Sequence, residues 1–313
     1  MHDLAETIEN FLSTAKKPLI VILGPTAAGK TALSIQLAKA LNGEIVSADS
    51  RQIYRGMDIA TDKIAQNARE GIPHHLIDII DPDEPFTLSD YKKIAEKTID
   101  EILEKGKIPF LVGGTGLYIN AVTENFQIPE GAPDKNFRQK LEKEAKSSSP
   151  KALHAMLAKI DPSTASRIHP KNLMYTIRAL EINLSLGKKK ERKKGPAKYE
   201  TLYIGIRWPK EDVWKRIEAR VAEQIQRGLL AETEKLMEKY DPALPSMSSL
   251  GYRQLIQFLN GEIPYKEAIE RIVIETRQYA KRQMTWFKKN PDIIWLDGYT
   301  LSKNHENLLP KTH

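Results

Sequence analysis

Short apolar runs alternate with helical patterns through the first part of the chain. Four runs have the length and apolar character of buried strands: Leu19–Leu23, Glu44–Ser47, His75–Ile80 and Ile108–Val112. Apolar residues recur with a helical period over Thr31–Leu41 and after Ser89, which we expect to cap its helix. This alternation predicts a parallel sheet with helices on both faces and ligands at the carboxyl ends of the strands.

The pattern changes after about residue 123. Up to Lys198 the chain is polar, and helical periods recur over three segments: Asn136–Lys146, Lys151–Ile160 and Asn172–Leu186. The basic run Lys188–Lys194 follows and is either a solvated linker or a contact for a polyanion. A strand-like run returns at Thr201–Ile206, and we expect the remainder to be helical.

The stretch after the first strand-like run carries the most informative motif. It reads Gly24, Pro25, Thr26, Ala27, Ala28, Gly29, Lys30, Thr31. This is the spacing of a phosphate-binding loop, or P-loop, in which backbone N–H groups and Lys30 contact phosphate and the Thr31 hydroxyl can hold Mg²⁺. The motif leaves open which phosphate compound binds, and whether phosphate is transferred or discarded.

Together these patterns predict an α/β fold, with a P-loop doubly wound parallel sheet as core and a helical insertion domain. We expect residues 1–123 to form the first part of the core, 124–200 the insertion, and 201–313 the return to the core with C-terminal helices.

Composition excludes several classes of protein. The chain has 313 residues, 41% of them hydrophobic, and no cysteine, which rules out disulfides and thiolate chemistry. The N-terminus is acidic, and no segment approaches the ~18 apolar residues of a membrane span, so we expect a cytoplasmic protein. The net charge of +7 favours a polyanionic partner, although many basic enzymes bind no nucleic acid.

A second candidate site residue, Asp49, follows the second strand-like run. We expect that strand to neighbour the P-loop strand, which would place Asp49 beside the bound phosphate. A carboxylate there can hold Mg²⁺ through water, accept a proton from a nucleophile, or cap the next turn. The turn Gly113–Gly116 ends another strand and is by itself only a weak signal.

Two cationic segments lie in the C-terminal half. Arg216 and Arg220 are one helical turn apart, and a shared anion would explain this repulsive pair, although Glu218 and Glu223 also fit a solvated face. Within 271–289, basic residues alternate with aromatic ones. That pattern suits RNA, whose unpaired bases stack on rings and guanidinium planes, but the aromatic residues fit a protein core equally well.

Six motifs in order resemble the tRNA dimethylallyltransferases, also called tRNA isopentenyltransferases. They are Gly24–Thr31, Asp49–Tyr54, Gly113–Tyr118, Arg178–Glu181, Leu250–Gln254 and Thr276–Gln283. The likeness covers most of the chain and is closest to the bacterial form, because the zinc finger of eukaryotic relatives needs cysteine. The family usually has Ser where Ala28 stands, and we expect little consequence since backbone N–H groups bind the phosphate.

The resemblance implies prenyl transfer rather than phosphoryl transfer. The donor would be dimethylallyl diphosphate, and the acceptor the exocyclic N6 amine of the adenine immediately 3′ of the anticodon in tRNA. The P-loop, with Thr26, Lys30 and a Mg²⁺ held by Thr31, would then neutralise a departing diphosphate. Arg220 would complete this clamp, and whether Arg216 joins it stays open.

By the same resemblance, Asp49 would accept the proton of the attacking amine, and Thr115 would lie beside the target base. The base must leave the anticodon loop to enter the pocket. The residues expected to contact tRNA are Asp49, Ser50, Arg51, Gln52, Met174, Tyr175, Thr176, Ile177, Arg178, Ser248, Ser249, Leu250, Gly251, Tyr252, Arg253, Arg277, Lys281 and Arg282. We expect a monomer with no membrane partner.

Two other functions compete with this interpretation. A small-molecule or nucleotide kinase would share the P-loop, the sheet and an acidic residue after the second strand, but it has no use for a basic insertion. A noncatalytic RNA-binding module would explain the charge but not Asp49 beside the loop.

Overall fold

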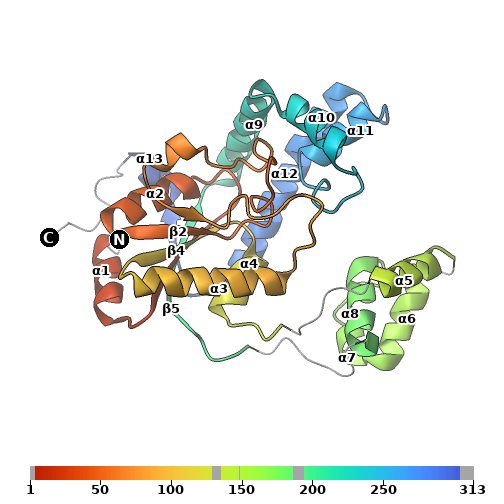
Figure 1. Cartoon of the computed structure of the whole chain (residues 1–313), viewed down its shortest axis with the longest axis horizontal. Helices are drawn as coiled ribbons and strands as arrows, with labels where there is room; N and C mark the ends of the chain where they lie inside the picture. The colour runs from red at the N-terminus through yellow and green to blue at the C-terminus, as the bar shows by residue number, and fades with distance from the viewer. Residues whose placement is uncertain (1–3, 129–134, 148, 186–193, 304–313) are drawn as a thin grey trace. The chain divides into compact units, whose positions relative to one another are not determined.

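The computed structural model describes residues 4–128, 135–147, 149–185 and 194–303. The chain divides into two units, one formed by Met1–Asn125 with Pro196–His313 and the other by Phe126–Gly195 (Figure 1). The first unit contains the sheet and is called the core unit below. The second contains only helices among its described elements and is called the helical unit.

A six-stranded sheet forms the centre of the core unit, in the order β3-β2-β4-β1-β5-β6, and all its neighbouring strands are parallel. The strands are β1 (Pro18–Leu23), β2 (Gly43–Ser47), β3 (His74–His75), β4 (Ile108–Gly113), β5 (Glu200–Arg207) and β6 (Ile293–Asp297). The predicted parallel α/β fold is confirmed. The expectation that β2 lies beside β1 is wrong, because β4 lies between these two strands.

Both faces of the sheet are covered, as alternation along β1 shows. Leu19, Val21 and Leu23 join one buried cluster, and Ile20 and Ile22 join another. The first cluster includes α3 (Leu88–Glu104) and α4 (Gly116–Thr123), whereas the second includes α1 (Leu4–Thr14) and α2 (Lys30–Ala40). Figure 1 shows α2 and α3 on opposite sides of the strands. A strand buried on both faces explains the continuous apolar run in the sequence.

Three local expectations are wrong. The run His75–Ile80 gives only the two-residue β3, because Leu76 and Asp78 adopt left-handed backbone angles with φ of 62° and 58° that end the strand. Helix α3 is capped by Thr87 rather than Ser89, in a reciprocal capping box with Asp90. The C-terminal part is not wholly helical, since β6 extends the sheet beside β5.

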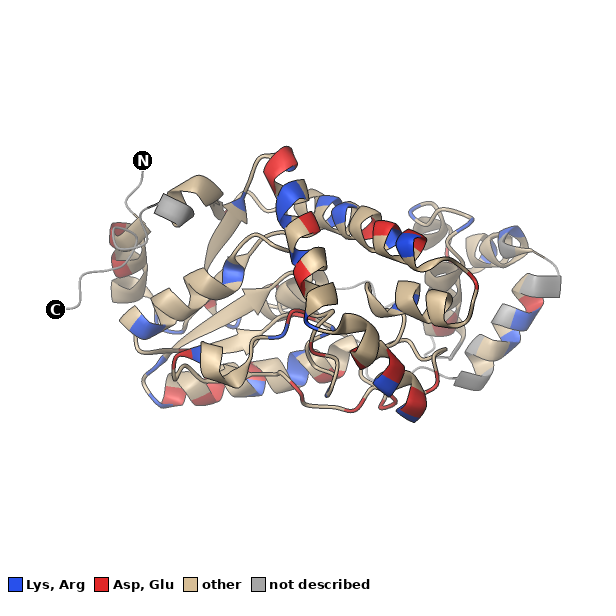
Figure 2. Ribbon diagram, turned by 90° about the horizontal axis from the view of Figure 1, so that it is seen from above, with Lys and Arg blue, Asp and Glu red and all other residues tan. Residues whose placement is uncertain are grey.

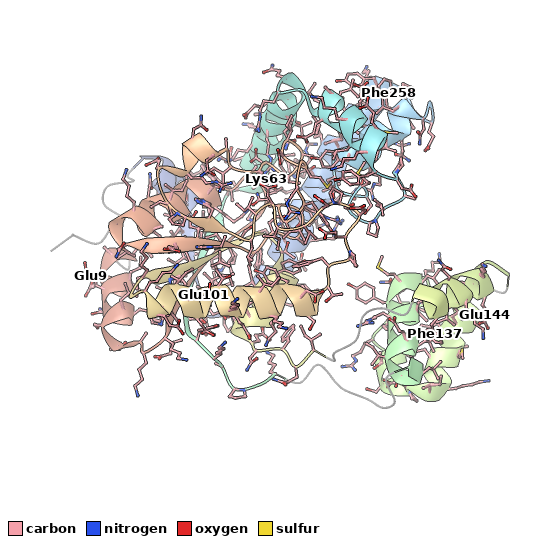
Figure 3. The ribbon with its side chains drawn as sticks, in the orientation of Figure 1. Glu9, Lys63, Glu101, Phe137, Glu144 and Phe258 are labelled. Atoms are coloured by element: carbon pink, nitrogen blue, oxygen red, sulfur yellow. The ribbon has the colours of Figure 1, made fainter. Side chains whose placement is uncertain are left out.

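The remaining helices of the core unit are α9 (Lys210–Gln226), α10 (Leu229–Lys239), α11 (Tyr252–Leu259), α12 (Tyr265–Phe287) and α13 (Gly298–Lys303). Four of them, α9 to α12, share a buried cluster with Ile53, Tyr54 and Met57 from the segment after β2. Lys63, labelled in Figure 3, fixes that segment, because its buried ammonium pairs with Asp58 and Asp78. The segment after β2 is therefore held between the sheet and the C-terminal helices.

The helical unit has a small core of its own. Its helices are α5 (Lys135–Ser147), α6 (Pro150–Ile160), α7 (Pro162–Ala165) and α8 (Leu173–Ser185). Leu141, Leu153, Leu157 and Leu180 form the centre of its buried cluster. The helices expected at 136–146, 151–160 and 172–186 are thus present, with ends shifted by a residue.

Basic and acidic residues are interspersed along most helices (Figure 2). No helix within the described ranges is both long enough and apolar enough to cross a membrane. The basic run expected at 188–194 lies outside the described residues except for Lys194.

Candidate active site

The P-loop joins β1 to α2 through two residues with left-handed backbone angles. Ala27 has a φ of 60° and Gly29 a φ of 97°. Gly29 adopts such an angle without the steric cost that a Cβ would add, which explains the glycine before the helix. Helix α2 then begins at Lys30, and its first N–H groups have no partner within the helix. A helix end of this kind binds anions.

Two side chains outside the motif hold the carbonyl groups of the P-loop. The indole Nε1 of Trp208 donates to the Ala28 oxygen over 3.0 Å, and Nε of Arg216 donates to the Ala27 oxygen over 2.7 Å. The Arg216 guanidinium also lies over the Trp208 ring, 4.5 Å from its centroid. In a trans peptide the N–H points away from the carbonyl, so the bond from Trp208 to the Ala28 oxygen turns the N–H of Gly29 away from Trp208.

The contacts of Arg216 bear on the open question of whether it joins the diphosphate clamp. Its guanidinium is engaged with the loop backbone and an indole ring, although it also lines the pocket described below. Arg220, one turn further along α9, instead donates to the Thr26 hydroxyl over 2.7 Å and faces Asp62 at 3.5 Å. The two arginines thus have separate tasks, one beside the loop backbone and one beside its side chains.

Positive charge is concentrated at this end of the site. The Lys30 ammonium hydrogen-bonds the carbonyl groups of Gly24 and Pro25, at 3.2 and 2.8 Å. Burial, together with the nearby charge of Arg220, lowers the pKa of Lys30 to about 8, although the carboxylates of Asp49 and Asp62 oppose this shift. The charged form of this lysine lacks full compensation, so a bound anion would stabilise it.

The other end of the site carries oxygen groups. The Asp49 carboxylate accepts a hydrogen bond from the Arg51 N–H over 2.8 Å, so it caps the turn after β2. The Thr115 hydroxyl accepts from the Ser50 N–H over 3.1 Å, which links the turns after β2 and β4. Tyr279 of α12 lies nearby. Burial, together with the charge of Asp49, raises the pKa of Tyr279 to about 12, although a hydrogen bond with Thr115 opposes this shift. Tyr279 therefore keeps its phenolic proton at neutral pH.

Both ends open into one pocket of about 540 Å³. Its lining includes the P-loop from Thr26 to Thr31, together with Asp49, Asp62, Arg220 and Tyr279. The strand order explains the layout, because the turn after β4 is directly beside the P-loop and the Asp49 turn comes next along the same edge. One cavity thus holds Lys30 and Arg220, with Asp62 facing Arg220, beside the P-loop, and Asp49 with Tyr279 beside the turn after β2.

The same lining carries oxygen groups that suit Mg²⁺. Thr31, Asp49 and Asp62 supply hard oxygen donors, the type that Mg²⁺ prefers. Over the described residues, no group of three or more His, Cys, Asp or Glu could hold a metal by itself. The residues fit an ion held by one or two protein oxygens and completed by water and phosphate.

Comparisons with known proteins decide the family. A family model described as IPP transferase matches residues 52–290, and one described as isopentenyl transferase matches residues 17–74. The chain belongs to the IPP transferase family. Among its relatives, the tRNA dimethylallyltransferase of Roseiflexus sp. is 48% identical over 89% of this chain and 92% of its own. That of Bacillus subtilis is 42% identical over 91% of this chain and 92% of its own.

Solved structures of the IPP transferase family agree with this assignment. The full-length tRNA isopentenylpyrophosphate transferase of Bacillus halodurans has a TM-score of 0.69 at 42% identity and covers 90% of both chains. A eukaryotic dimethylallyltransferase described as acting on tRNA has a TM-score of 0.79 at 32% identity, over 93% of this chain and 76% of its own. The relatives give no support to the kinase alternative.

Several residues that the resemblance assigned to RNA contact are buried in this IPP transferase. Thr176, Ile177, Ser249 and Tyr252 are at most 4% exposed. The Tyr252 hydroxyl donates a hydrogen bond to Glu232, which explains why this polar group is stable in the core. Direct RNA contact by these four side chains would require them to become exposed, so it stays a prediction.

Other predicted contacts are accessible to different degrees. Met174 and Tyr175 are 77% and 58% exposed at the start of α8, an unusual position for large apolar side chains. Ser248, Lys281 and Arg282 are also exposed. Such side chains remain available to a nucleic acid.

Three of the predicted arginine contacts are already paired within the protein. Arg178 pairs with Glu181 at 2.6 Å, Arg253 pairs with Glu275, and Arg277 pairs with Glu218 and lies over the Trp214 ring.

Two further predicted contacts donate to the backbone of the protein. Arg51 donates to the Pro245 carbonyl over 3.0 Å, and Gln52 donates to the Thr61 carbonyl over 3.2 Å. Leu250 is half-buried, and Gly251 is buried, with a φ of 94° at the start of α11. Contact with RNA would compete with these intramolecular bonds.

Sequence reasoning missed Trp208, Asp62 and Tyr279 as parts of the site. Trp208 follows β5 directly, at the carboxyl edge of the sheet where ligands are expected, and that position was an available signal. Tyr279 stands in a motif that the resemblance included, four residues before Gln283, so both lie on one face of α12. Asp62 comes from an irregular segment and had no local signal.

Proposed function

We propose that this protein transfers a dimethylallyl group from dimethylallyl diphosphate to the exocyclic N6 amine of the adenine 3′ of the anticodon in tRNA, with release of diphosphate. One observation supports the proposal above the others. A single pocket joins a cationic P-loop to a carboxylate with neighbouring hydroxyls, so a leaving diphosphate and an attacking amine can be served at the same time. Membership of the IPP transferase family supports a prenyl diphosphate as the donor.

The P-loop end would receive the leaving group. As the bond between the allylic carbon and the diphosphate oxygen breaks, its electron pair stays on that oxygen and negative charge grows there. Lys30, Arg220 and the N–H groups at the start of α2 are placed to stabilise this charge. Mg²⁺ bound through Thr31 would supply further charge neutralisation when present.

The opposite end would receive the adenine. Its N6 lone pair forms the new bond to the allylic carbon while that carbon gains cationic character, and the amine then has to lose a proton. The Asp49 carboxylate is the acceptor we assign to that proton, and a general base of this kind typically contributes ~10²–10⁴ in rate. Thr115 and Tyr279 would orient the base through their hydroxyl groups.

The base must be extruded from the anticodon loop, which costs a few kcal/mol. We propose that the exposed cations of α12 and the exposed residues at the start of α8 bind the RNA that surrounds it. Because both ends of the pocket come from one chain, we also propose a monomer as the active form.

A donor experiment tests this function. Purified protein is incubated with unmodified tRNA and Mg²⁺, with either dimethylallyl diphosphate carrying a labelled prenyl carbon or γ-labelled ATP. A tRNA with guanine in place of the target adenine serves as the matched control. We expect label in the adenine-containing tRNA from the prenyl donor alone. Label from ATP only, or from neither donor, would refute the proposal.

A further inference from the structure

A buried glutamine connects the two ends of the pocket. Gln283, about one turn before the end of α12, is 6% exposed. Its Oε1 accepts the Thr26 N–H over 2.8 Å, and its Nε2 donates to the Gly114 carbonyl over 2.9 Å. Thr26 belongs to the P-loop, whereas Gly114 precedes Thr115 in the turn after β4. One side chain therefore bonds the loop of the leaving group and the turn of the acceptor end.

The fit around this amide is close. A Cβ added to Gly114 would lie 2.3 Å from Nε2 of Gln283, well below any normal contact distance. The glycine thus leaves the space in which the amide sits. The absence of a side chain at Gly114 therefore matches the position of the Gln283 amide.

The chemistry of the contact requires an amide. One atom must accept from an N–H and another must donate to a carbonyl, and a glutamine offers both groups on one carbon. Methionine has a similar length but offers neither group. The partly buried N–H of Thr26 and the buried carbonyl of Gly114 would then lose their partners, which frees the two loops to shift.

We infer that Gln283 is a positioning residue, which sets the distance between the diphosphate loop and the turn that carries Thr115. This inference rests on the proposed prenyl transfer. Reacting atoms have to meet at about 3–3.5 Å, and a displacement of about 1 Å can cost ~10²-fold in rate. Although Gln283 also lines the pocket, both groups of its amide are engaged with the protein backbone, so its loss should act on the chemical step more than on either binding step.

The test compares Gln283→Met, Gly114→Ala and the double variant under single-turnover conditions, with dimethylallyl diphosphate and unmodified tRNA. At saturating concentrations of both substrates, we expect each single variant to transfer about 10- to 100-fold more slowly than the wild type. Separately measured dissociation constants for tRNA and for inorganic diphosphate should change less than about 3-fold. Because both changes break the same contact, the double variant should be no slower than the slower single variant.

Gln224→Met is the matched control. Gln224 is also buried and also donates to backbone carbonyl groups, those of Ile59 and Ala60. It should lower the melting temperature as Gln283→Met does but keep the transfer rate. Rates within about 3-fold of wild type in both single variants would overturn the inference, as would a loss explained by weaker binding or by failure of all three variants to fold. Absence of transfer by the wild type would instead refute the proposed function.

Discussion

The two ends of the pocket are built from the same kind of element but carry opposite chemistry. Both ends are turns that follow parallel strands, β1 at one end and β2 with β4 at the other. The first collects Lys30 and, from α9, Arg220, whereas the second collects Asp49 and, from α12, Tyr279. Thr115 is bonded to the Ser50 N–H in the turns of the second end. A parallel sheet brings its strand ends to one edge, so side chains of opposite function become neighbours without any single segment carrying both.

The two ends also differ in what supports them. Side chains outside the motif, those of Trp208 and Arg216, hold the P-loop through its carbonyl groups. The acceptor end is held by bonds between its own turns, from the N–H groups of Ser50 and Arg51 to Thr115 and Asp49, in addition to the Gln283 bond that reaches both ends. Substitutions at the first end should thus affect the use of the prenyl donor, and substitutions at the second end should affect the rate of transfer to the acceptor.

The largest effect is expected for Asp49→Ala. Loss of the proposed base should lower the single-turnover transfer rate by ~10²–10⁴-fold, while tRNA affinity stays within a few fold of wild type. Filter binding of tRNA and the appearance of prenylated adenine measure the two quantities separately. A parallel collapse of tRNA affinity would make Asp49 a recognition residue and remove the distinction between the two ends.

Arg220→Ala should have the next largest effect. Removal of one charged donor from the leaving group should reduce kcat/KM for dimethylallyl diphosphate by about 10²-fold, with tRNA affinity retained. Arg227→Ala is the control, since Arg227 also pairs with Asp62, at 3.5 Å, but is not part of this pocket. Equal losses in both variants would show that the effect comes from Asp62 rather than from the leaving group.

A smaller effect is expected for Thr115→Val. The change removes the hydroxyl that accepts the Ser50 N–H but keeps the shape of the side chain. A lost hydrogen bond of about 1 kcal/mol corresponds to roughly 5-fold in transfer rate, with no change in the affinity for inorganic diphosphate. Steady-state kinetics with each substrate varied in turn checks this split. A change confined to the diphosphate affinity would contradict it.

The smallest effect on activity is expected at the opposite end of β2. Burial alone would raise the pKa of Glu44, but hydrogen bonds from Lys107 and His75 outweigh burial and lower it below its ordinary value. The stability that Glu44 contributes is present above its unfolded pKa of about 4.3 and is lost as the pH falls through the lower folded value.

Glu44→Gln should therefore flatten the loss of stability on acidification and leave prenyl transfer at neutral pH unchanged. Denaturant unfolding at pH 7 and at pH 4 measures the first quantity. A wild-type protein that loses no more stability than the variant on acidification would contradict the account. A variant without activity at neutral pH would show that the two ends of β2 are not independent.

Sequence reasoning succeeded where the signal is local. The P-loop motif carries its own strand, glycines and helix start, so Gly24–Thr31 could be predicted without knowledge of the rest of the fold. The strand β1 was equally clear, because burial on both faces leaves a continuous apolar run. Asp49 was predicted from its place after a strand, although β4 rather than β2 proved to adjoin β1.

Features that depend on distant contacts could not be predicted in this way. The burial of Ser249 and Tyr252 depends on packing among α9 to α12, and their polar groups look like surface groups in the sequence. The role of Gln283 depends on a bond to Thr26, 257 residues away. The short β3 follows from left-handed angles at Leu76 and Asp78, and a leucine in the sequence gives no signal for such an angle.

The central claim is that one end of the pocket binds the leaving group and the other end performs proton transfer. Calorimetric titration of inorganic diphosphate with Mg²⁺ into the wild type, Arg220→Ala and Asp49→Asn tests it most directly. The account predicts at least about 10-fold weaker binding for Arg220→Ala, a loss of about 1.4 kcal/mol, and wild-type or tighter binding for Asp49→Asn. Weaker binding in Asp49→Asn together with unchanged binding in Arg220→Ala would contradict the account.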